Sequence, residues 1–193
     1  RLIGPERLIW RFDPIVFTQY SDPEETLARF ERLSGELSGY TRRCTISFMS
    51  PYRRQRRAFE QAGLQHREPT QAQRVELSQA LAHLASERGM TLEACCQGDL
   101  LEGPVLKAHC VDAHLLAALG AEFDGRAPAA PSRPGCGCSQ SMDIGAYDLC
   151  GGGCAYCYAN QDHDLAMRNL SRHDPAHQGL AEAYLSAPAD PLR

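Results

Sequence analysis

Residues 8–37 read LIWRFDPIVFTQYSDPEETLARFERLSGEL and give the first indication of the fold. Residues 8–12 are mostly apolar and aromatic, which predicts a β-strand. A helix is predicted over residues 23–37, because Asp22 can cap its amino end, Pro23 suits its first position and Gly39 follows its last turn. A strand followed by a helix is the repeating unit of a layered α/β fold.

The same alternation continues through the first two thirds of the chain. Further strands are predicted over residues 44–49 and 91–95, and further helices over residues 52–62, 70–88 and 112–119. Residues 120–135 are rich in Ala, Pro and Gly and are interpreted as a long loop. The sequence therefore predicts an α/β fold with a parallel sheet. Three strand–helix units are too few for a closed barrel, so we expect a partial TIM-like (β/α) barrel that lacks its N-terminal units.

Composition and charge indicate an ordinary globular protein. The 193 residues are 43% hydrophobic and 23% charged, with a net charge of -4, so no overall attraction to nucleic acid or anionic lipid is indicated. The basic run of Arg53, Arg54, Arg56 and Arg57 is interpreted as the solvated face of a helix. Because the sequence shows neither a membrane-spanning stretch nor a signal peptide, we expect a cytoplasmic protein without a membrane partner.

Nine cysteines are the compositional outlier. An odd number, the absence of an export signal and a Cys-x-Cys pair too close for easy mutual bridging favour reduced thiols over disulfides. Reduced and clustered thiols indicate a metal site.

Cys150, Cys154 and Cys157 have the spacing CxxxCxxC, with Gly151, Gly152 and Gly153 between the first two. Three cysteines on such a flexible loop can each bind a different iron of a 4Fe-4S cluster and leave the fourth iron open to the amine and carboxylate of an amino acid. A structural zinc site is the main alternative, since zinc binds four thiolates or a mixture of thiolates and histidine. Paired CxxC knuckles would favour zinc, whereas a single CxxxCxxC favours the cluster.

This loop resembles that of the radical S-adenosylmethionine superfamily in its intervals and in the ring of Tyr156 before the last cysteine. The resemblance implies a 4Fe-4S cluster and S-adenosylmethionine as cofactors, and an electron donor such as a ferredoxin or flavodoxin. It implies that one electron from the cluster cleaves S-adenosylmethionine to methionine and a 5'-deoxyadenosyl radical, which abstracts hydrogen from a substrate that the sequence does not identify. Usual members of the superfamily carry the cysteine loop after the first barrel strand, whereas here it follows the last predicted strand.

A longer set of segments is similar to the family called domain of unknown function 1848, whose members carry a radical S-adenosylmethionine-like cluster at the C-terminus. The segments that carry this resemblance are Gly4-Pro5-Glu6-Arg7, Trp10-Arg11-Phe12-Asp13-Pro14, Leu92-Glu93-Ala94-Cys95, Arg133-Pro134-Gly135-Cys136-Gly137-Cys138, Asp143-Ile144-Gly145-Ala146-Tyr147-Asp148 and Gly153-Cys154-Ala155-Tyr156-Cys157-Tyr158-Ala159-Asn160. We accordingly expect residues 1–135 to be the C-terminal portion of an α/β barrel. Residues 136–163 would form a Cys-rich iron-sulfur loop and residues 164–193 a short helix and tail, all within one domain.

Several residues outside the loop are candidates for the site. Arg11, Asp13 and Glu93 are expected, with Tyr156, to contact cofactor or substrate, although an ion pair that braces the barrel is an open alternative for the charged residues. A second iron-sulfur cluster or a zinc ion could be bound by four further thiols, those of Cys95, Cys110, Cys136 and Cys138.

The remaining thiols and polar residues near the motifs receive structural interpretations. Cys44 and Cys96 are interpreted as structural, and the Cys96 side chain is expected to point away from Cys95. His109 could be a metal ligand but is more simply structural. Tyr158 and Asn160 are expected to support the loop.

The sequence thus predicts a radical S-adenosylmethionine-type iron-sulfur enzyme of unknown substrate. Two alternatives stay open, namely a non-catalytic iron-sulfur protein for electron transfer or sensing and a structural zinc protein.

Overall fold

The structure is a computed structural model that describes residues 3–50, 52–122, 127–131, 133–142 and 145–176. The chain forms two compact units: unit 1 contains Arg1–Pro51 and Leu64–Ser141, and unit 2 contains Tyr52–Gly63 and Met142–Arg193. Most of the predicted tail, together with Asp143 and Ile144 of the quoted motif, lies outside the described residues.

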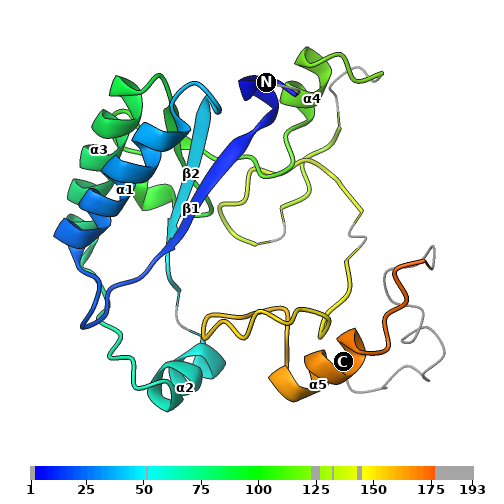
Figure 1. Cartoon of the computed structure of the whole chain (residues 1–193). Helices are drawn as coiled ribbons and strands as arrows, with labels where there is room; N and C mark the ends of the chain where they lie inside the picture. The colour runs from blue at the N-terminus through cyan, green and yellow to red at the C-terminus, as the bar shows by residue number, and fades with distance from the viewer. Residues whose placement is uncertain (1–2, 51, 123–126, 132, 143–144, 177–193) are drawn as a thin grey trace. The chain divides into compact units, whose positions relative to one another are not determined.

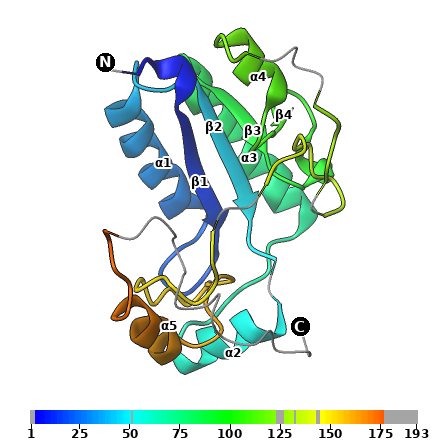
Figure 2. The same ribbon diagram turned by 90° about the vertical axis from the view of Figure 1, so that its right-hand side faces the viewer.

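Unit 1 is built on a parallel sheet of four strands in the order in which they occur in the chain: β1(Ile9–Ile15), β2(Arg43–Phe48), β3(Thr91–Ala94) and β4(Leu106–Lys107). Helix α1(Pro23–Leu37) connects β1 to β2, and α3(Gln71–Glu87) connects β2 to β3. Both helices lie side by side on the same face of the sheet (Figure 1, Figure 2). The predicted α/β fold with a parallel sheet is confirmed.

The shorter elements of unit 1 are two 3-10 helices, η1(Pro5–Arg7) and η2(Gly98–Leu100), and α4(Ala113–Ala118) after β4. The sequence did not predict β4, because a strand of two residues that are both exposed leaves no alternation to detect.

Helix ends follow the capping signals of the sequence. The Asp22 side chain accepts a hydrogen bond of 2.9 Å from the backbone N–H of Glu25, and Pro23 occupies the first position of α1, so the predicted bounds are confirmed. Thr70 and Gln73 form a capping box at the start of α3.

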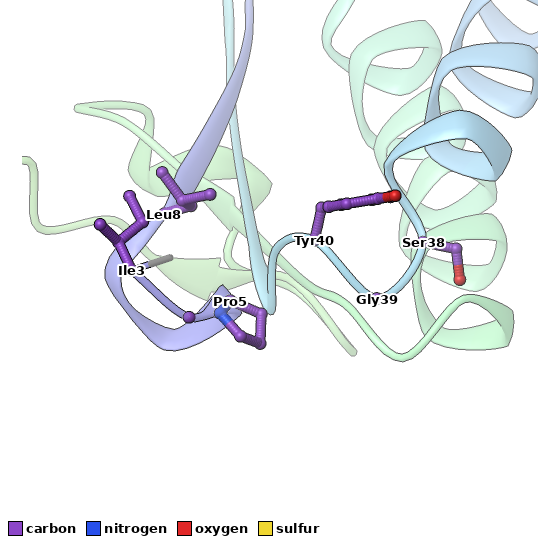
Figure 3. Close-up of a pocket in the computed structure, with 7 residues that line it drawn as sticks. Ile3, Pro5, Leu8, Ser38, Gly39 and Tyr40 are labelled. Atoms are coloured by element: carbon purple, nitrogen blue, oxygen red, sulfur yellow. The ribbon is translucent and has the colours of Figure 1, made fainter. Parts of the chain in front are cut away.

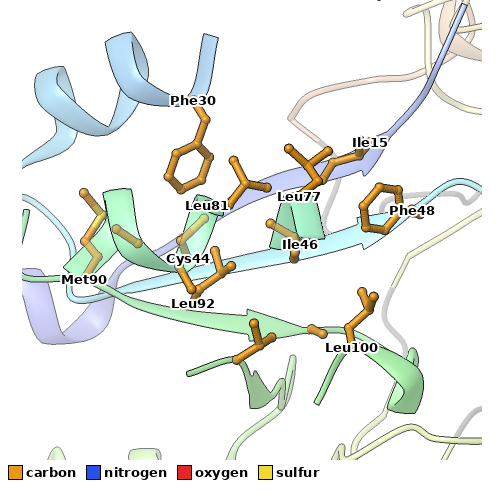
Figure 4. Packing of buried hydrophobic residues seen from close by; sticks show 14 of the residues in the cluster. Ile15, Phe30, Cys44, Ile46, Phe48, Leu77, Leu81, Met90, Leu92 and Leu100 are labelled. Atoms are coloured by element: carbon orange, nitrogen blue, oxygen red, sulfur yellow. The ribbon is translucent and has the colours of Figure 1, made fainter. Parts of the chain in front are cut away.

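Aromatic and aliphatic side chains fill the space between the sheet and the two helices (Figure 4). Phe30 of α1 is fully buried, with its ring centroid 4.8 Å from that of Trp10 and 5.1 Å from that of Phe12. Cys44 lies in this core with no exposed surface, as its structural interpretation predicted, and burial raises the pKa of its thiol.

The opposite face of the sheet is polar. Strand alternation that sends Cys44 and Ile46 into the core sends Arg43, Thr45 and Ser47 to the other side. In the sheet register, Arg11 of β1 is level with Thr45 of β2 and Thr45 with Glu93 of β3. This face and the strand ends beside it hold the candidate site of unit 1.

Unit 2 contains α2(Arg53–Gln61), α5(His163–Leu170) and the loop with the CxxxCxxC cysteines. The four arginines of α2 are exposed, and Arg54 donates a hydrogen bond to the Asn160 carbonyl of the loop, so the interpretation of the basic run as a solvated face stays a prediction. Asp162 caps α5 by accepting a hydrogen bond from the backbone N–H of Leu165. Among the described residues, no helix has the length and apolar character needed to cross a bilayer.

Candidate functional site

A buried ion-pair network occupies the polar face of the unit 1 sheet. Arg43 donates from Nε to Glu93 Oε1 at 2.6 Å and from Nη2 to Glu93 Oε2 at 3.1 Å. It also donates from Nη1 to Asp112 Oδ2 at 3.1 Å. Bonds to the two carboxylates raise the pKa of Arg43 although burial acts to lower it. Glu93 is thus held by a bidentate ion pair with Arg43, as in the alternative interpretation of Glu93 as part of a bracing ion pair. Contact between Glu93 and a cofactor stays a prediction.

Arg11 and Asp13 form a second pair on this face. The Arg11 guanidinium donates to both Asp13 oxygens, at 3.2 and 2.6 Å, and to the sulfur of Cys110 at 3.0 Å. The Ser47 hydroxyl lies 3.4 Å from Asp13 Oδ2. The Arg11 side chain is 46% exposed, so it remains open to a ligand, whereas Asp13 is 12% exposed.

Three thiols meet where β3 ends. The Cys95 sulfur is 3.7 Å from that of Cys96 and 3.8 Å from that of Cys110. The prediction that Cys96 points away from Cys95 is wrong, because Cys96 has left the strand and adopts a φ of 56°. In that left-handed conformation strict strand alternation no longer applies.

The pKa values of Cys95 and Cys110 are shifted in opposite directions. A hydrogen bond with Cys110 lowers the pKa of Cys95 to about 7, and a contact with the Arg133 guanidinium, 3.8 Å from the sulfur, acts in the same direction. The interaction with Cys95 raises the pKa of Cys110, although Arg11 opposes that rise.

Cys136 and Cys138 lie on a loop that contacts both segments bearing the other thiols. A Cβ at Gly135 would lie 3.4 Å from the carbonyl carbon of Cys96, and one at Gly137 would lie 2.9 Å from the Ala108 oxygen and 3.0 Å from His109 Cε1. Burial raises the pKa of Cys138, and the neighbouring Cys136 and Cys110 thiols add to that rise.

The structure therefore brings the four thiols of the predicted second site into one region of unit 1, and Cys96 with them. His109 packs against the same loop.

In unit 2 the three cysteines of the CxxxCxxC loop are free thiols with backbone donors close by. The N–H of Gly152 lies 3.4 Å from the Cys150 sulfur, and the N–H of Asn160 lies 3.2 Å from the Cys157 sulfur. A Cβ at Gly152 would lie 3.3 Å from the Cys150 sulfur and 3.6 Å from the Cys154 sulfur, so these two thiols lie close to one another beside the glycine.

Asn160 ties the two ends of this loop together. Its side-chain N–H₂ donates to the Cys150 carbonyl at 2.6 Å, and its Oδ1 accepts from the Cys150 N–H at 3.3 Å. Asn160 is 5% exposed, and its predicted supporting role is confirmed. Tyr158 is 77% exposed and Tyr156 half-buried, so their predicted roles stay predictions.

A buried carboxylate supports the same loop. Asp148 is almost fully buried, its N–H donates to the Ala159 carbonyl at 2.8 Å, and its carboxylate accepts from the N–H of Gln161. Asp148 belongs to one of the segments that resemble the DUF1848 family, but its support of the loop was not predicted from the sequence.

The described residues form two pockets. One of about 270 Å³ in unit 2 is lined by Ala146, Leu149, Leu170 and His173 and borders the loop through Leu149. The other, of about 480 Å³, lies at the amino ends of β1 and β2 in unit 1 (Figure 3) and is lined by Ile3, Gly4, Pro5, Leu8, Ser38, Gly39 and Tyr40. Parallel strands place their carboxyl ends at the opposite edge, so this second pocket is remote from the unit 1 thiols.

The three thiols of the CxxxCxxC loop are suitable ligands for an iron-sulfur cluster. Three thiols on one short segment, two of them beside backbone N–H groups, are the donors and the surroundings that such clusters use. In the described part of the chain, no three Cys, His, Asp or Glu side chains are already grouped so that they could hold a metal ion. Binding would therefore require the thiols to turn toward a common centre.

Sequence reasoning missed Arg43, Asp112 and Arg133 as members of these networks. Arg43 could have been found by extending the alternation of β2 back from Cys44, since that places Arg43 on the polar face. No local signal marks Arg133, which reaches Cys95 across 38 positions of the chain.

Comparisons with known proteins bear on the family. A search of the curated proteins found no match, and a search of the solved structures found none either. A family model described as a domain of unknown function, DUF1848, matches residues 1–159, which include all nine cysteines. The chain therefore belongs to the DUF1848 family.

Proposed function

We propose that this protein is a radical S-adenosylmethionine-type iron-sulfur enzyme that acts on a substrate still to be identified. The observation that carries the proposal is the loop of Cys150, Cys154 and Cys157 in unit 2, with three free thiols and backbone N–H groups beside two of the sulfurs. Three ligands for four irons leave one iron for the amino and carboxylate groups of S-adenosylmethionine.

The chemistry supplied by the bound group is a one-electron reduction that splits S-adenosylmethionine into methionine and a 5'-deoxyadenosyl radical, the electron coming from a donor such as a ferredoxin or flavodoxin. The residues of this chain would bind the cluster and orient S-adenosylmethionine. The three thiolates would hold the cluster, the N–H groups of Gly152 and Asn160 would stabilise their negative charge, and Tyr156 would lie near the adenine.

We also propose that unit 1 is part of a TIM-like (β/α) barrel. Parallel strands in sequence order, with α1 and α3 on one face, are the arrangement of consecutive units of a (β/α) barrel, whereas a doubly wound sheet reverses its strand order and carries helices on both faces. In such a barrel the polar face with Arg11, Asp13 and Glu93 would look toward the barrel interior.

One observation favours a second candidate, a structural zinc site. A Cβ at Gly153 would lie 3.4 Å from Cε1 of His163, so an imidazole lies beside the glycine that precedes Cys154, and Cys₃His is a common zinc ligand set. The single CxxxCxxC spacing favours the cluster over this alternative.

The experiment compares anaerobically reconstituted wild-type protein with the Cys154→Ser variant, and uses Cys44→Ala as a control for loss of a thiol outside the loop. Iron and acid-labile sulfide are measured in each, followed by 5'-deoxyadenosine after reduction with dithionite in the presence of S-adenosylmethionine. We expect wild type and Cys44→Ala to hold iron and sulfide in equal amounts and to form 5'-deoxyadenosine. We expect Cys154→Ser to lose the iron and sulfide and to form no 5'-deoxyadenosine.

Other results would lead to the alternatives. Iron and sulfide without 5'-deoxyadenosine would favour the electron-transfer function. Zinc bound in their place, and lost in a His163→Ala variant, would establish the structural site.

A further inference from the structure

The spacing of the thiols at the end of β3 matches that of a tetrahedral metal site. The Cys95 sulfur is 3.7 Å from Cys96 and 3.8 Å from Cys110. Zinc–sulfur bonds of about 2.3 Å at tetrahedral angles separate two ligand sulfurs by about 3.8 Å. Cysteines of a four-iron cluster bind different irons and stand farther apart, so the spacing fits a single ion.

Two more thiols are brought to the same place by the loop that carries them. Gly135 lies in van der Waals contact with the backbone of Cys96, and Gly137 packs so closely against Ala108 that a Cβ there would clash with the Ala108 carbonyl oxygen. The N–H of Ser139 donates to the Val111 carbonyl at 2.9 Å, which fixes the loop beside the segment of Cys110. Thiols from three separate segments of the chain therefore share one small region.

Two guanidinium groups approach this region. Arg11 Nη1 lies 3.0 Å from the Cys110 sulfur, and Arg133 Nη2 lies 3.8 Å from the Cys95 sulfur. Four thiolates around a divalent ion carry two excess negative charges, and two guanidiniums offset that charge while donating N–H groups to sulfur.

We propose that unit 1 contains a mononuclear thiolate site for a divalent ion of the zinc class, bound by Cys95 and Cys110 together with two of the thiols of Cys96, Cys136 and Cys138. The site does not depend on the radical chemistry proposed for unit 2, because none of its ligands belongs to the CxxxCxxC loop. The side chains as they stand do not yet surround an ion, so binding turns the Cys136 or Cys138 thiol toward the Cys95–Cys110 pair.

The test uses the full chain with Cys150, Cys154 and Cys157 all changed to Ser, so that the loop of unit 2 cannot contribute. Cobalt(II) is titrated into this reduced, metal-free protein under anaerobic conditions. We expect one equivalent to bind with the visible bands of tetrahedral cobalt and the near-ultraviolet charge-transfer absorption of cobalt–thiolate bonds, and zinc to displace it.

Variants in the same background locate the site. Adding Cys95→Ser and Cys110→Ser is expected to abolish the charge-transfer absorption, whereas adding Cys44→Ala is expected to leave it unchanged. The proposal is overturned if the loop variant binds no cobalt, or if binding survives the loss of Cys95 and Cys110.

A second measurement covers the case in which the double substitution prevents folding. Zinc is added to the loop variant before alkylation, and each cysteine is quantified by mass spectrometry. We expect zinc to protect Cys95 and Cys110 at least tenfold relative to the metal-free protein. Equal alkylation with and without zinc, or protection that air alone reproduces through a Cys95–Cys110 disulfide, would refute the metal site.

Discussion

Replacement of Arg43 by Met should destabilise unit 1 more than any change to an exposed ion pair. The Glu93 side chain is 7% exposed, and both of its oxygens accept hydrogen bonds from Arg43. Without the guanidinium a buried carboxylate is left unpaired, and removal of one partner from a buried pair costs about 3–5 kcal/mol. The second carboxylate, Asp112, loses its partner too but is 16% exposed, so water can compensate it in part.

Exposed Arg32 provides the matched control. Its pair with Glu36 has the same chemistry, but the two side chains are 65% and 62% exposed, so Arg32→Met should cost only about 0.3–0.5 kcal/mol. A double variant, Arg43→Met with Glu93→Leu, removes the unpaired charge and should recover most of the loss.

Urea unfolding followed by tryptophan fluorescence measures these differences for unit 1. Trp10 is the single tryptophan of the chain and is stacked on Phe30 in the unit 1 core, so its emission reports the opening of that core. A free energy of unfolding for Arg43→Met within about 1 kcal/mol of that for Arg32→Met would refute the argument from burial.

Three further predictions follow from single contacts. Leu81→Ala should lower the free energy of unfolding by about 2–5 kcal/mol in the same assay, because Leu81 is fully buried between α3 and the sheet; a loss below 1 kcal/mol would contradict this packing. Asn160→Ala removes two hydrogen bonds to the Cys150 backbone and should cost about 1–3 kcal/mol of local stability, seen as faster proteolysis of the loop and, if the proposed cluster is reconstituted, as iron lost on gel filtration; Met142→Ala, at a side chain that is 86% exposed, is the control. The amino end of α4 and Arg43 lower the pKa of Asp112 despite burial, so its folded pKa lies below the ordinary value of 3.8. Its contribution to stability is present above that value and lost as the pH falls through the folded pKa, so the stability gap between wild type and Asp112→Asn should shrink below about pH 4, and a constant gap would contradict the assignment.

Local signals were sufficient to predict the longer helices and strands of unit 1, namely α1, α3, β1, β2 and β3. Asp22 and Pro23 determine the start of α1, and Thr70 that of α3, because capping depends on neighbours within one turn. The alternation in β2 likewise predicts a strand with one core face. These features depend on residues close in the sequence, which is why they could be predicted without coordinates.

Contacts between distant segments could not be predicted in the same way. The orientation of Cys96 depends on a left-handed backbone conformation that no local residue preference announces, and the interpretation of Cys96 as pointing away was wrong for that reason. Arg133 reaches Cys95, and Arg43 reaches Asp112, only because the fold brings their segments together. Cys95 and Cys110 lie 3.8 Å apart because β3 and β4 end at the same edge of the parallel sheet, and their binding of a metal stays a prediction.

The measurement that tests the proposed function most directly is electron paramagnetic resonance of anaerobically reconstituted, dithionite-reduced protein, recorded with and without S-adenosylmethionine. If the three loop thiols leave one iron open to the cofactor, we expect a reduced 4Fe-4S signal whose g values change when S-adenosylmethionine is added. A cluster signal that stays the same at saturating S-adenosylmethionine would contradict an open iron, and with it the enzyme proposed here.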